Sequence, residues 1–246
     1  MSFKSRKHKF VKDVGGTVLK TFEKMVTKTS KVPTTPFLDH TQFSWTKKLE
    51  NNWRVMRSEV DKILEHENAL PNFQDISEDQ KAITTDDNWK TFFLFGFGHK
   101  MEKNCAICPN TANLVEDIPG MKTAFFSILS PGKHIPDHRG LYRGLLRYHL
   151  GLKIPEPKED IIIRVDEEYR NWEEGKSMMF DDTYQHEVWN NTDSIRVILF
   201  MDILRPLSFP FSKINDGILH LVKKSDYVQN AVKNQKAWEE KLQKLE

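Results

Sequence analysis

The fold class is indicated by a stretch that begins with KTAFFSILS, residues 122–130. It is the first of several short apolar runs after Gly120 that are rich in Val, Ile and Phe and separated by Gly, Pro, Asn and Asp. The other runs are residues 145–152, 160–165, 177–180, 186–189 and 195–204. Short strands at this density are typical of an antiparallel sandwich or barrel. We therefore expect a mainly β domain with flanking helices.

The sequence on either side of this β region has a helical pattern. Over residues 44–68, apolar side chains beginning with Trp45 and Leu49 recur at helical spacing. Further helices are expected over 101–118 and 224–246. We expect four parts: a basic N-terminal segment (1–32), a helical flanking region (33–118), a β core (119–215) and a C-terminal helix (216–246).

The net charge of +2 conceals a strongly basic N-terminus. Residues 1–31 contain nine Lys and Arg but only Asp13 and Glu23, so the rest of the chain carries a net negative charge. A nucleic-acid partner is not expected, because phosphate binding needs basic charge on the folded surface. Residues 10–28 have a weakly amphipathic helical pattern. This pattern favours either peripheral contact with anionic lipid or packing on the protein's own domain.

The compartment is inferred from what the sequence lacks. No apolar run has the length of a membrane span, and no block of signal-peptide length follows the basic N-terminus. Only two cysteines, Cys105 and Cys108, are present, which fits a reducing compartment. We expect a cytoplasmic protein, with peripheral contact at the inner face of a membrane left open. The CxxC pair is half of a zinc site, and we interpret it as two nearby thiols.

Two histidines on opposite sides of the β region are candidate metal ligands. His138 and His186 are 48 residues apart, and an early and a late strand lie side by side in a closed jelly roll. Neutral imidazole is a good ligand for iron. Taken alone, a histidine among apolar strands is more often a satisfied core residue than a metal ligand.

Polar side chains inside apolar strands form the second candidate feature. Arg196 lies in SIRVILF, and a buried arginine is costly unless an anion pairs with it. A dicarboxylate ligand or an acid from another strand would each meet that need. Arg147 and His149 are two residues apart in LLRYHLGL, so they share one face of a strand and also suggest an anion or polar ligand. Ser127 has a similar position on the strand before His138.

Several motifs occur in order between residues 88 and 206. They are WKTFF (89–93), CPNT (108–111), FSILSPGKHIPDHRG (126–140), LRYHLGL (146–152), NWEEGK (171–176), FDDTYQHEVW (180–189) and RVILF (196–200). In this order they resemble the aspartyl/asparaginyl β-hydroxylase family. That family includes bacterial lipid A acyl-chain hydroxylases, and the ending DILRPL (202–207) is similar to that branch.

The resemblance implies a double-stranded β-helix, the jelly-roll or cupin-like fold, and a dioxygenase that uses Fe(2+), O2 and the co-substrate 2-oxoglutarate. It implies that His138 and His186 bind the iron. It further implies that Arg196 binds the distal carboxylate of 2-oxoglutarate with help from Ser127. The difficult chemistry would belong to iron and co-substrate, while the protein supplies geometry and anion binding.

The same resemblance places Arg147 and His149 along the co-substrate pocket. It also singles out Gly140, which stands where the carboxylate of a two-histidine, one-carboxylate iron triad would lie. The animal β-hydroxylases also have Gly there and bind iron through two histidines and solvent, whereas the lipid A hydroxylases carry Asp. We interpret Asp181 and Asp182 either as hydrogen-bond partners of a ligand histidine or as turn residues.

The first expectation for the substrate is an Asp or Asn side chain in a peptide or amino-acid derivative. The first alternative is an acyl chain of a membrane lipid, with the basic N-terminal segment docking on anionic headgroups. A second alternative is a non-catalytic β-sandwich binding protein, which the missing carboxylate at Gly140 keeps open. A halogenase would also need a small residue at that position, but the motifs match hydroxylases.

Overall fold

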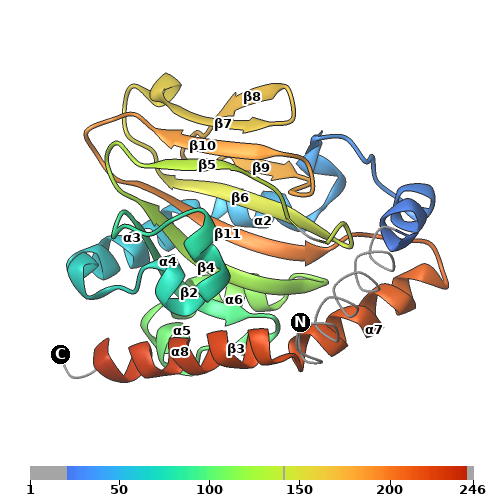
Figure 1. Ribbon diagram of the computed structural model, residues 1–246. Coiled ribbons are helices and arrows are strands. Elements are labelled where there is room, and N and C mark those ends of the chain that lie inside the picture. Colours follow the sequence, from blue (N-terminus) through green and yellow to red (C-terminus); the bar gives the residue numbers. More distant parts are fainter. Residues whose placement is uncertain (1–20, 141, 243–246) are drawn as a thin grey trace, which may run out of the picture.

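The computed structural model describes residues 21–140 and 142–242, which form two antiparallel sheets with helices around them (Figure 1). The larger sheet has the strand order β1-β9-β6-β11-β4-β2-β3 and the smaller one β5-β10-β7-β8. The strands of the larger sheet are β1 (Phe37–Leu38), β2 (Trp89–Gly96), β3 (His99–Lys100), β4 (Met121–Leu129), β6 (Leu145–Lys153), β9 (Ser177–Phe180) and β11 (Arg196–Leu204). Those of the smaller sheet are β5 (His134–His138), β7 (Ile161–Val165), β8 (Glu168–Asn171) and β10 (His186–Asn190). The expected jelly-roll, cupin-like fold is confirmed.

The burial of the strands explains why the two sheets differ in sequence. In β7 and β10 buried and half-buried residues alternate, because only one face of the smaller sheet is covered. The central strands β4 and β11 are buried along nearly their whole length, because the larger sheet is covered on both faces. They therefore read as continuous apolar runs.

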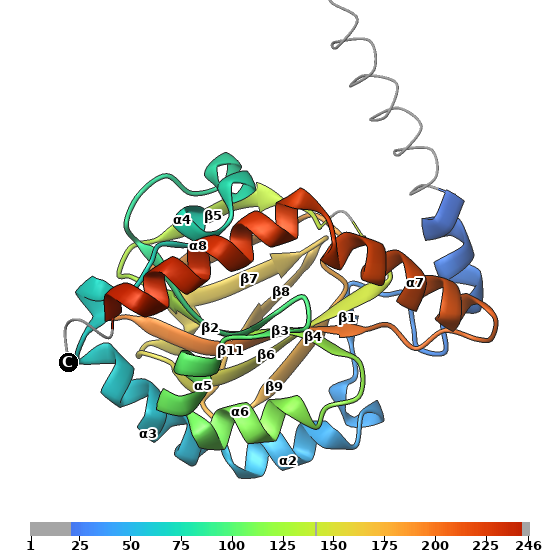
Figure 2. The same cartoon turned by 90° about the horizontal axis from the view of Figure 1, so that it is seen from below.

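Helices cover the outer face of the larger sheet. They are α2 (Trp45–Asn51), α3 (Trp53–Leu64), α5 (Glu102–Ile107) and α6 (Pro109–Glu116), and Figure 2 shows them along one side of it. Leu49, Met56 and Val60 pack there against Phe126 and Leu150 in one buried cluster. The predicted helical segments 44–68 and 101–118 are confirmed as helix pairs.

A second cluster lies between the two sheets. Phe125 and Ile163 belong to it, from the larger and the smaller sheet respectively. Ile76 of α4 (Phe73–Ile76) also belongs to it. The remaining short elements are the 3-10 segments η1 (His40–Gln42), η2 (Glu67–Ala69), η3 (Glu78–Ala82) and η4 (Lys158–Asp160). Val228 and Val232, from the C-terminal region, close one side of this cluster.

Two expectations about the flanking regions need correction. The helical region 33–118 also contains β2, which pairs with β4 inside the larger sheet. The single C-terminal helix is instead two helices, α7 (Phe211–Lys223) and α8 (Asp226–Leu242), and α7 begins inside the predicted core 119–215. The boundaries of the four parts otherwise stay predictions.

Residues 21–29 form a helix that packs on the body of the protein. Phe22 and Val26 are buried against Leu207, and the Phe22 ring stacks on Tyr142 with 5.5 Å between centroids. For these residues, packing on the protein's own domain is the arrangement found. The remainder of the amphipathic pattern lies outside the described residues. Within the described part of the chain, no helix has the length and apolar character that crossing a membrane requires.

Candidate active site

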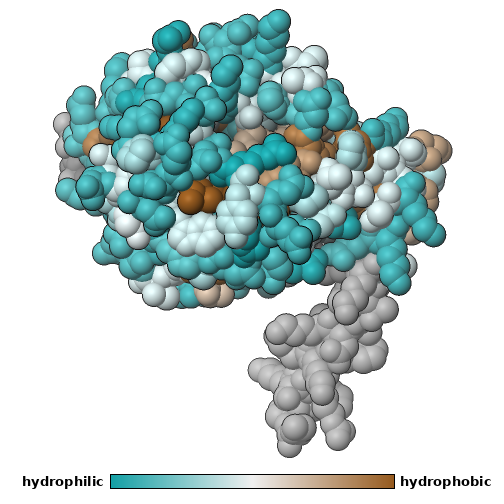
Figure 3. Space-filling model, turned by 90° about the horizontal axis from the view of Figure 1, so that it is seen from above, coloured by the Kyte–Doolittle hydropathy of each residue, from teal (hydrophilic) through white to brown (hydrophobic). Residues whose placement is uncertain are grey.

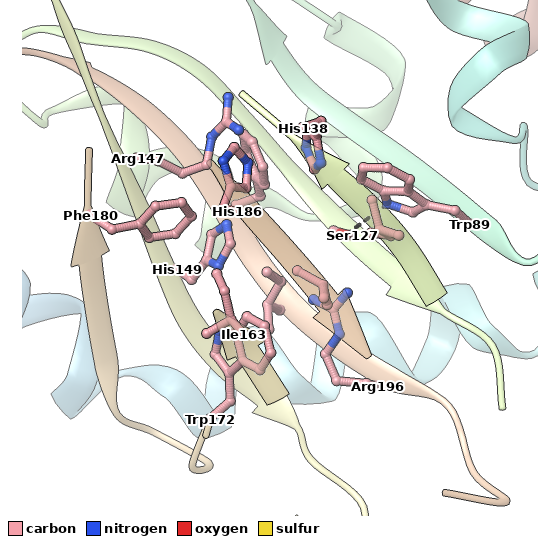
Figure 4. A pocket seen from close by; sticks show the side chains of 14 residues that line it. Trp89, Ser127, His138, Arg147, His149, Ile163, Trp172, Phe180, His186 and Arg196 are labelled. Carbon is pink, nitrogen blue, oxygen red and sulfur yellow. Dashed lines mark hydrogen bonds between the residues drawn. The ribbon is translucent and has the colours of Figure 1, made fainter. Parts of the chain in front are cut away.

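A pocket opens between the two sheets and brings together all six residues that the sequence predicted (Figure 4). Its lining comes from both sheets. The lining residues are Trp89, Ser127, Ile135, His138, Arg147, His149, Ile163, Trp172, Phe180, His186, Val188, Arg196, Ile198 and Phe200. The sequence motifs contained Trp89, Trp172 and Phe180, but nothing in their spacing assigned them to the pocket.

The two histidines face each other across a strand pair. His138 at the end of β5 is the register partner of His186 at the start of β10, and their ring centroids are 4.1 Å apart. Burial lowers the pKa of both imidazoles, so both are neutral near pH 7. A neutral pair at this separation is suited to a shared metal ion.

Backbone carbonyls fix the orientation of both rings. His138 Nδ1 lies 2.8 Å from the carbonyl oxygen of Pro136, and His186 Nδ1 lies 3.0 Å from that of Tyr184. A carbonyl only accepts, so each Nδ1 carries the hydrogen and donates it. Each Nε2 then keeps its lone pair for a metal. Of the two roles considered for Asp181 and Asp182, a hydrogen bond to a histidine is not found, because backbone carbonyls fill that role. Asp181 has the turn role instead, since its Oδ1 accepts a 3.0 Å hydrogen bond from the backbone N–H of Thr183.

Gly140 has no side chain that could bind a metal, and the space beside it is occupied by the buried carboxylate of Asp182. A Cβ atom at Gly140 would collide with the carboxylate of Asp182, which forms a 2.9 Å ion pair with Arg147. Burial raises the pKa of Asp182 to about 6. No group of three or more His, Cys, Asp or Glu side chains that could hold a metal occurs among the described residues. The protein part of the candidate metal site is therefore a histidine pair.

Arg196 lies at the deep end of the pocket with its charge unbalanced. The residue is 2% exposed, and across residues 21–140 and 142–242 it has no ion pair or hydrogen bond, with Nε buried and unsatisfied. Burial lowers the pKa of its guanidinium to about 9. The ring of Trp172, 5.1 Å from the guanidinium carbon, is its cation–π neighbour. The acid from another strand that the sequence left open is not found in this part of the chain.

Other polar atoms near Arg196 also lack partners. Both ring nitrogens of His149 and Nε1 of Trp172 are buried without a hydrogen bond in the described structure. Ser127 Oγ accepts a 3.0 Å hydrogen bond from Nε1 of Trp89, so its own O–H remains free to donate. Buried polar groups are rarely left unsatisfied in proteins. This concentration of donors is expected where an anionic ligand supplies the acceptors.

Arg147 differs from Arg196 because the protein balances its charge. Its guanidinium contacts Asp182 at 2.9 Å and Asp202 at 3.1 Å, and it lies over the ring of Phe200. The inference that Arg147 needs an external anion is therefore wrong, although the residue does line the pocket. Asp202 is the acid nearest to Arg196 along its own strand face, but it pairs with Arg147 instead.

The open end of the pocket lies beside the histidines. His138 and Arg147 are partly exposed, whereas Ser127, Trp172 and Arg196 are at most 2% exposed. The chain after β5 borders this end and connects it to a buried ion-pair network. In that network Asp181 contacts Arg205 at 2.6 Å and Arg143 at 3.2 Å. This network could not be inferred from sequence, because its members come from three separate segments.

The cysteine pair lies away from the pocket. Cys105 and Cys108 are buried free thiols in the helical layer. Burial raises the pKa of Cys105 to about 11, and that of Cys108 also rises. Both are therefore protonated near neutral pH, which suits packing and not metal ligation.

Comparison with known proteins places the chain in a family. The sequence profile of the aspartyl/asparaginyl beta-hydroxylase family matches residues 50–206. The chain is 46% identical to an ornithine lipid ester-linked acyl 2-hydroxylase of Rhizobium tropici, over 89% of this chain and 78% of that protein. It is 36% identical to the human aspartyl/asparaginyl beta-hydroxylase, over 65% of this chain but 21% of that protein.

Similar solved structures include a Cupin 2 conserved barrel domain protein from Salinispora arenicola. It is 12% identical with a TM-score of 0.31, over 57% of this chain and 92% of that one. The profile match and the sequence identities show the family. The chain belongs to the aspartyl/asparaginyl β-hydroxylase family and is a hydroxylase.

Proposed function

We propose that this hydroxylase is an Fe(II)- and 2-oxoglutarate-dependent dioxygenase that acts on an acyl chain of a membrane lipid. One observation carries the proposal: a neutral histidine pair stands at the open end of a pocket whose deep end holds an arginine without an anion. A metal site and an anion site at opposite ends of one pocket fit a ligand that chelates metal and ends in a carboxylate.

The histidines fit iron through their chemistry. Both have their Nδ1 hydrogens bonded to backbone carbonyls, so both would bind through Nε2 without changing protonation state. Imidazole nitrogen is a suitable ligand for Fe(II), and two protein ligands leave positions for co-substrate and O2. The space at Gly140 is filled by Asp182, so solvent or co-substrate would complete the coordination.

The deep end of the pocket fits the other half of 2-oxoglutarate. The distal carboxylate would accept hydrogen bonds from Arg196 and from the free O–H of Ser127. The ring of His149 lies between the arginine and the histidine pair, stacked near Trp172 at 5.8 Å. This aromatic wall excludes water, which strengthens the interaction between the guanidinium and the bound anion.

When bound, iron, 2-oxoglutarate and O2 together supply an oxidant that inserts one oxygen atom into a C–H bond and leaves succinate and CO2. The tasks of the protein are narrower. His138 and His186 hold the metal, Arg196 and Ser127 set the depth of the co-substrate, and apolar walls such as Phe180 and Phe200 keep bulk water away.

The lipid substrate is favoured by the extent of the similarity. The Rhizobium tropici lipid hydroxylase matches 89% of this chain at 46% identity, whereas the human relative matches 65% at 36%. We therefore place the acyl chain of an amino-acid-headed lipid before a peptide side chain, which reverses the order inferred from sequence. A peptide substrate remains the second candidate, favoured by Gly140. A cytoplasmic location with membrane contact belongs to the same proposal.

The test is turnover after anaerobic loading with Fe(II) and 2-oxoglutarate. Oxygen is admitted with either detergent-dispersed ornithine lipid or peptides that contain Asp and Asn, and succinate and hydroxylated product are quantified. We expect succinate to match hydroxylated lipid mole for mole. We expect losses of at least about 100-fold in His186→Ala and Arg196→Met.

Arg54→Met is the matched control. Arg54 is an exposed arginine that also lies over a tryptophan ring, that of Trp53, but in the helical layer away from the pocket. Its variant should keep wild-type turnover. Equal succinate from all variants would refute the enzymatic proposal and return the non-catalytic binding protein to first place. Product from the peptides alone would refute the lipid substrate.

A further inference from the structure

Large exposed apolar side chains gather at α7. Phe209, just before the helix, is 80% exposed, Leu221 is 70% exposed and Ile214 is 42% exposed. Ile214 and Leu221 are seven residues apart, which places them on one face two turns from each other. By contrast, the face of the protein seen in Figure 3, opposite the one along which α7 and α8 run, is mostly hydrophilic.

Basic side chains border this apolar stripe. Lys213 and Lys224 are exposed and lie on one flank of α7, with Asp216 as the exposed acid of that helix. Helix 21–29, which packs beside α7, adds exposed Lys24 and Lys28. Apolar side chains bordered by lysines are typical of a helix that lies in the headgroup region of a bilayer. We call Phe209, Lys213, Ile214, Leu221 and Lys224 the α7 surface.

The α7 surface is connected to the open end of the pocket. Tyr142, in the segment that follows β5, donates a 2.6 Å hydrogen bond to Asn215 Oδ1 on α7. Asn215 Nδ2 donates in turn to the carbonyl oxygen of Gly144, at 2.9 Å. The helix is thus fixed to the same segment that begins after His138 and borders the pocket. Figure 1 shows α7 and helix 21–29 together at this side of the sheets.

We propose that the α7 surface docks the protein on an anionic phospholipid bilayer and so brings the open end of the pocket to the acyl chains. Phe209, Ile214 and Leu221 would enter the boundary between headgroups and acyl chains. The lysines would contact lipid phosphates, each adding electrostatic attraction that salt screens. The purpose of this docking rests on the proposed lipid substrate, but the docking itself does not depend on turnover.

Vesicle binding of the full chain, without iron or co-substrate, tests the proposal. Co-sedimentation is measured with phosphatidylcholine vesicles that contain phosphatidylglycerol and with pure phosphatidylcholine vesicles. The apolar variant is Phe209→Ser with Leu221→Ser, and the charge variant is Lys213→Glu with Lys224→Glu. We expect each to weaken binding to the anionic vesicles at least about tenfold, which corresponds to about 1.4 kcal/mol. Wild type should bind the uncharged vesicles more weakly.

Tyr169→Ser is the matched control. Tyr169 is 64% exposed, but it lies on β8 of the smaller sheet, so its loss should leave vesicle binding unchanged. Circular dichroism and thermal unfolding confirm that each variant is folded, which exposed positions should allow. Turnover of detergent-dispersed lipid should also be unchanged, because no substituted side chain lines the pocket.

Three results would overturn the docking proposal. They are no binding by wild type, equal binding by wild type and both α7 variants, or a wild-type dimer in sedimentation velocity that the apolar variant dissociates. The last would assign the surface to a second copy of the chain. Vesicle binding without any turnover would refute the proposed function alone, whereas turnover in detergent without vesicle binding would refute the docking alone.

Discussion

Replacing Arg196 with Met should make the ligand-free protein more stable while abolishing co-substrate binding. Arg196 is buried with no counter-charge in the described chain, and burial lowers its pKa from the ordinary guanidinium value to about 9. At about 1.36 kcal/mol per pH unit, keeping this guanidinium charged costs about 5 kcal/mol. The pKa of this base is lower in the folded state, so the cost is fully present below pH 9 and disappears as the pH rises towards the ordinary pKa of an arginine.

Methionine retains the length and apolar character of the arginine stem but not its charge. Loss of the cation–π contact with Trp172 offsets about 0.5–2 kcal/mol of the stability gained by removing the buried charge. We therefore expect a net gain of about 3–4.5 kcal/mol, since replacing buried charges with apolar side chains is often stabilising. This gain corresponds to a rise in Tm of about 6–18 °C for a chain of this size.

Thermal unfolding in buffer free of carboxylates measures this gain, and a second series adds Fe(II) and 2-oxoglutarate without O2. At 100 times the Kd, the co-substrate should stabilise wild type by about 2.7 kcal/mol and the variant not at all. With ligand, the Tm of the variant should therefore exceed that of wild type by much less than it does without ligand. A variant that is less stable than wild type without ligand, or equally stabilised by 2-oxoglutarate, would refute the reasoning.

Arg205→Met is the internal control. Arg205 is also buried, at 1% exposed, but it contacts Asp181 at 2.6 Å. Removing Arg205 takes a counter-charge away from the buried carboxylate of Asp181. The same substitution should therefore destabilise the protein, by about 3–5 kcal/mol. Opposite signs for the two variants would show that pairing, and not burial alone, separates them.

Two further predictions concern positions outside the anion site. Gly140→Ala should lower the free energy of unfolding by about 1–3 kcal/mol in urea, because the new Cβ displaces the Asp182 carboxylate from its buried contact with Arg147. Wild-type stability would mean that this carboxylate moves without cost. A thiol reagent at pH 8 should leave Cys105 and Cys108 of the native protein unmodified, because burial raises the pKa of Cys105 to about 11 and that of Cys108 as well. Both should react in guanidinium chloride, and rapid modification of the native protein would contradict their burial.

The β core could be predicted from sequence because its alternation and turn residues are local signals. The smaller sheet shows this best, since one covered face makes β7 and β10 alternate. Strand β2 was hidden inside a helical region. Its run WKTFFLFG is mostly apolar and buried at every position but Lys90, because both faces are covered. Such a run has no period by which to distinguish it from a buried helix.

The residues of the candidate site could be predicted from sequence, but their ion pairs could not. Arg147 and Arg196 looked alike in sequence, each a charge inside an apolar strand. The difference lies in Asp182, in the turn after β9, and Asp202, on β11, which both reach Arg147. Partner choice across strands depends on register, and register is not visible in one strand alone. The α7 surface was likewise missed, because exposure depends on what the rest of the fold leaves uncovered.

Anaerobic equilibrium binding of Fe(II) and 2-oxoglutarate is the most direct test of the central claim. We expect one of each per chain in the wild type. We expect no bound iron in His138→Ala or His186→Ala, and iron without tightly bound 2-oxoglutarate in Arg196→Met. Wild type that binds neither, or variants that bind both as wild type does, would contradict the assignment of this pocket.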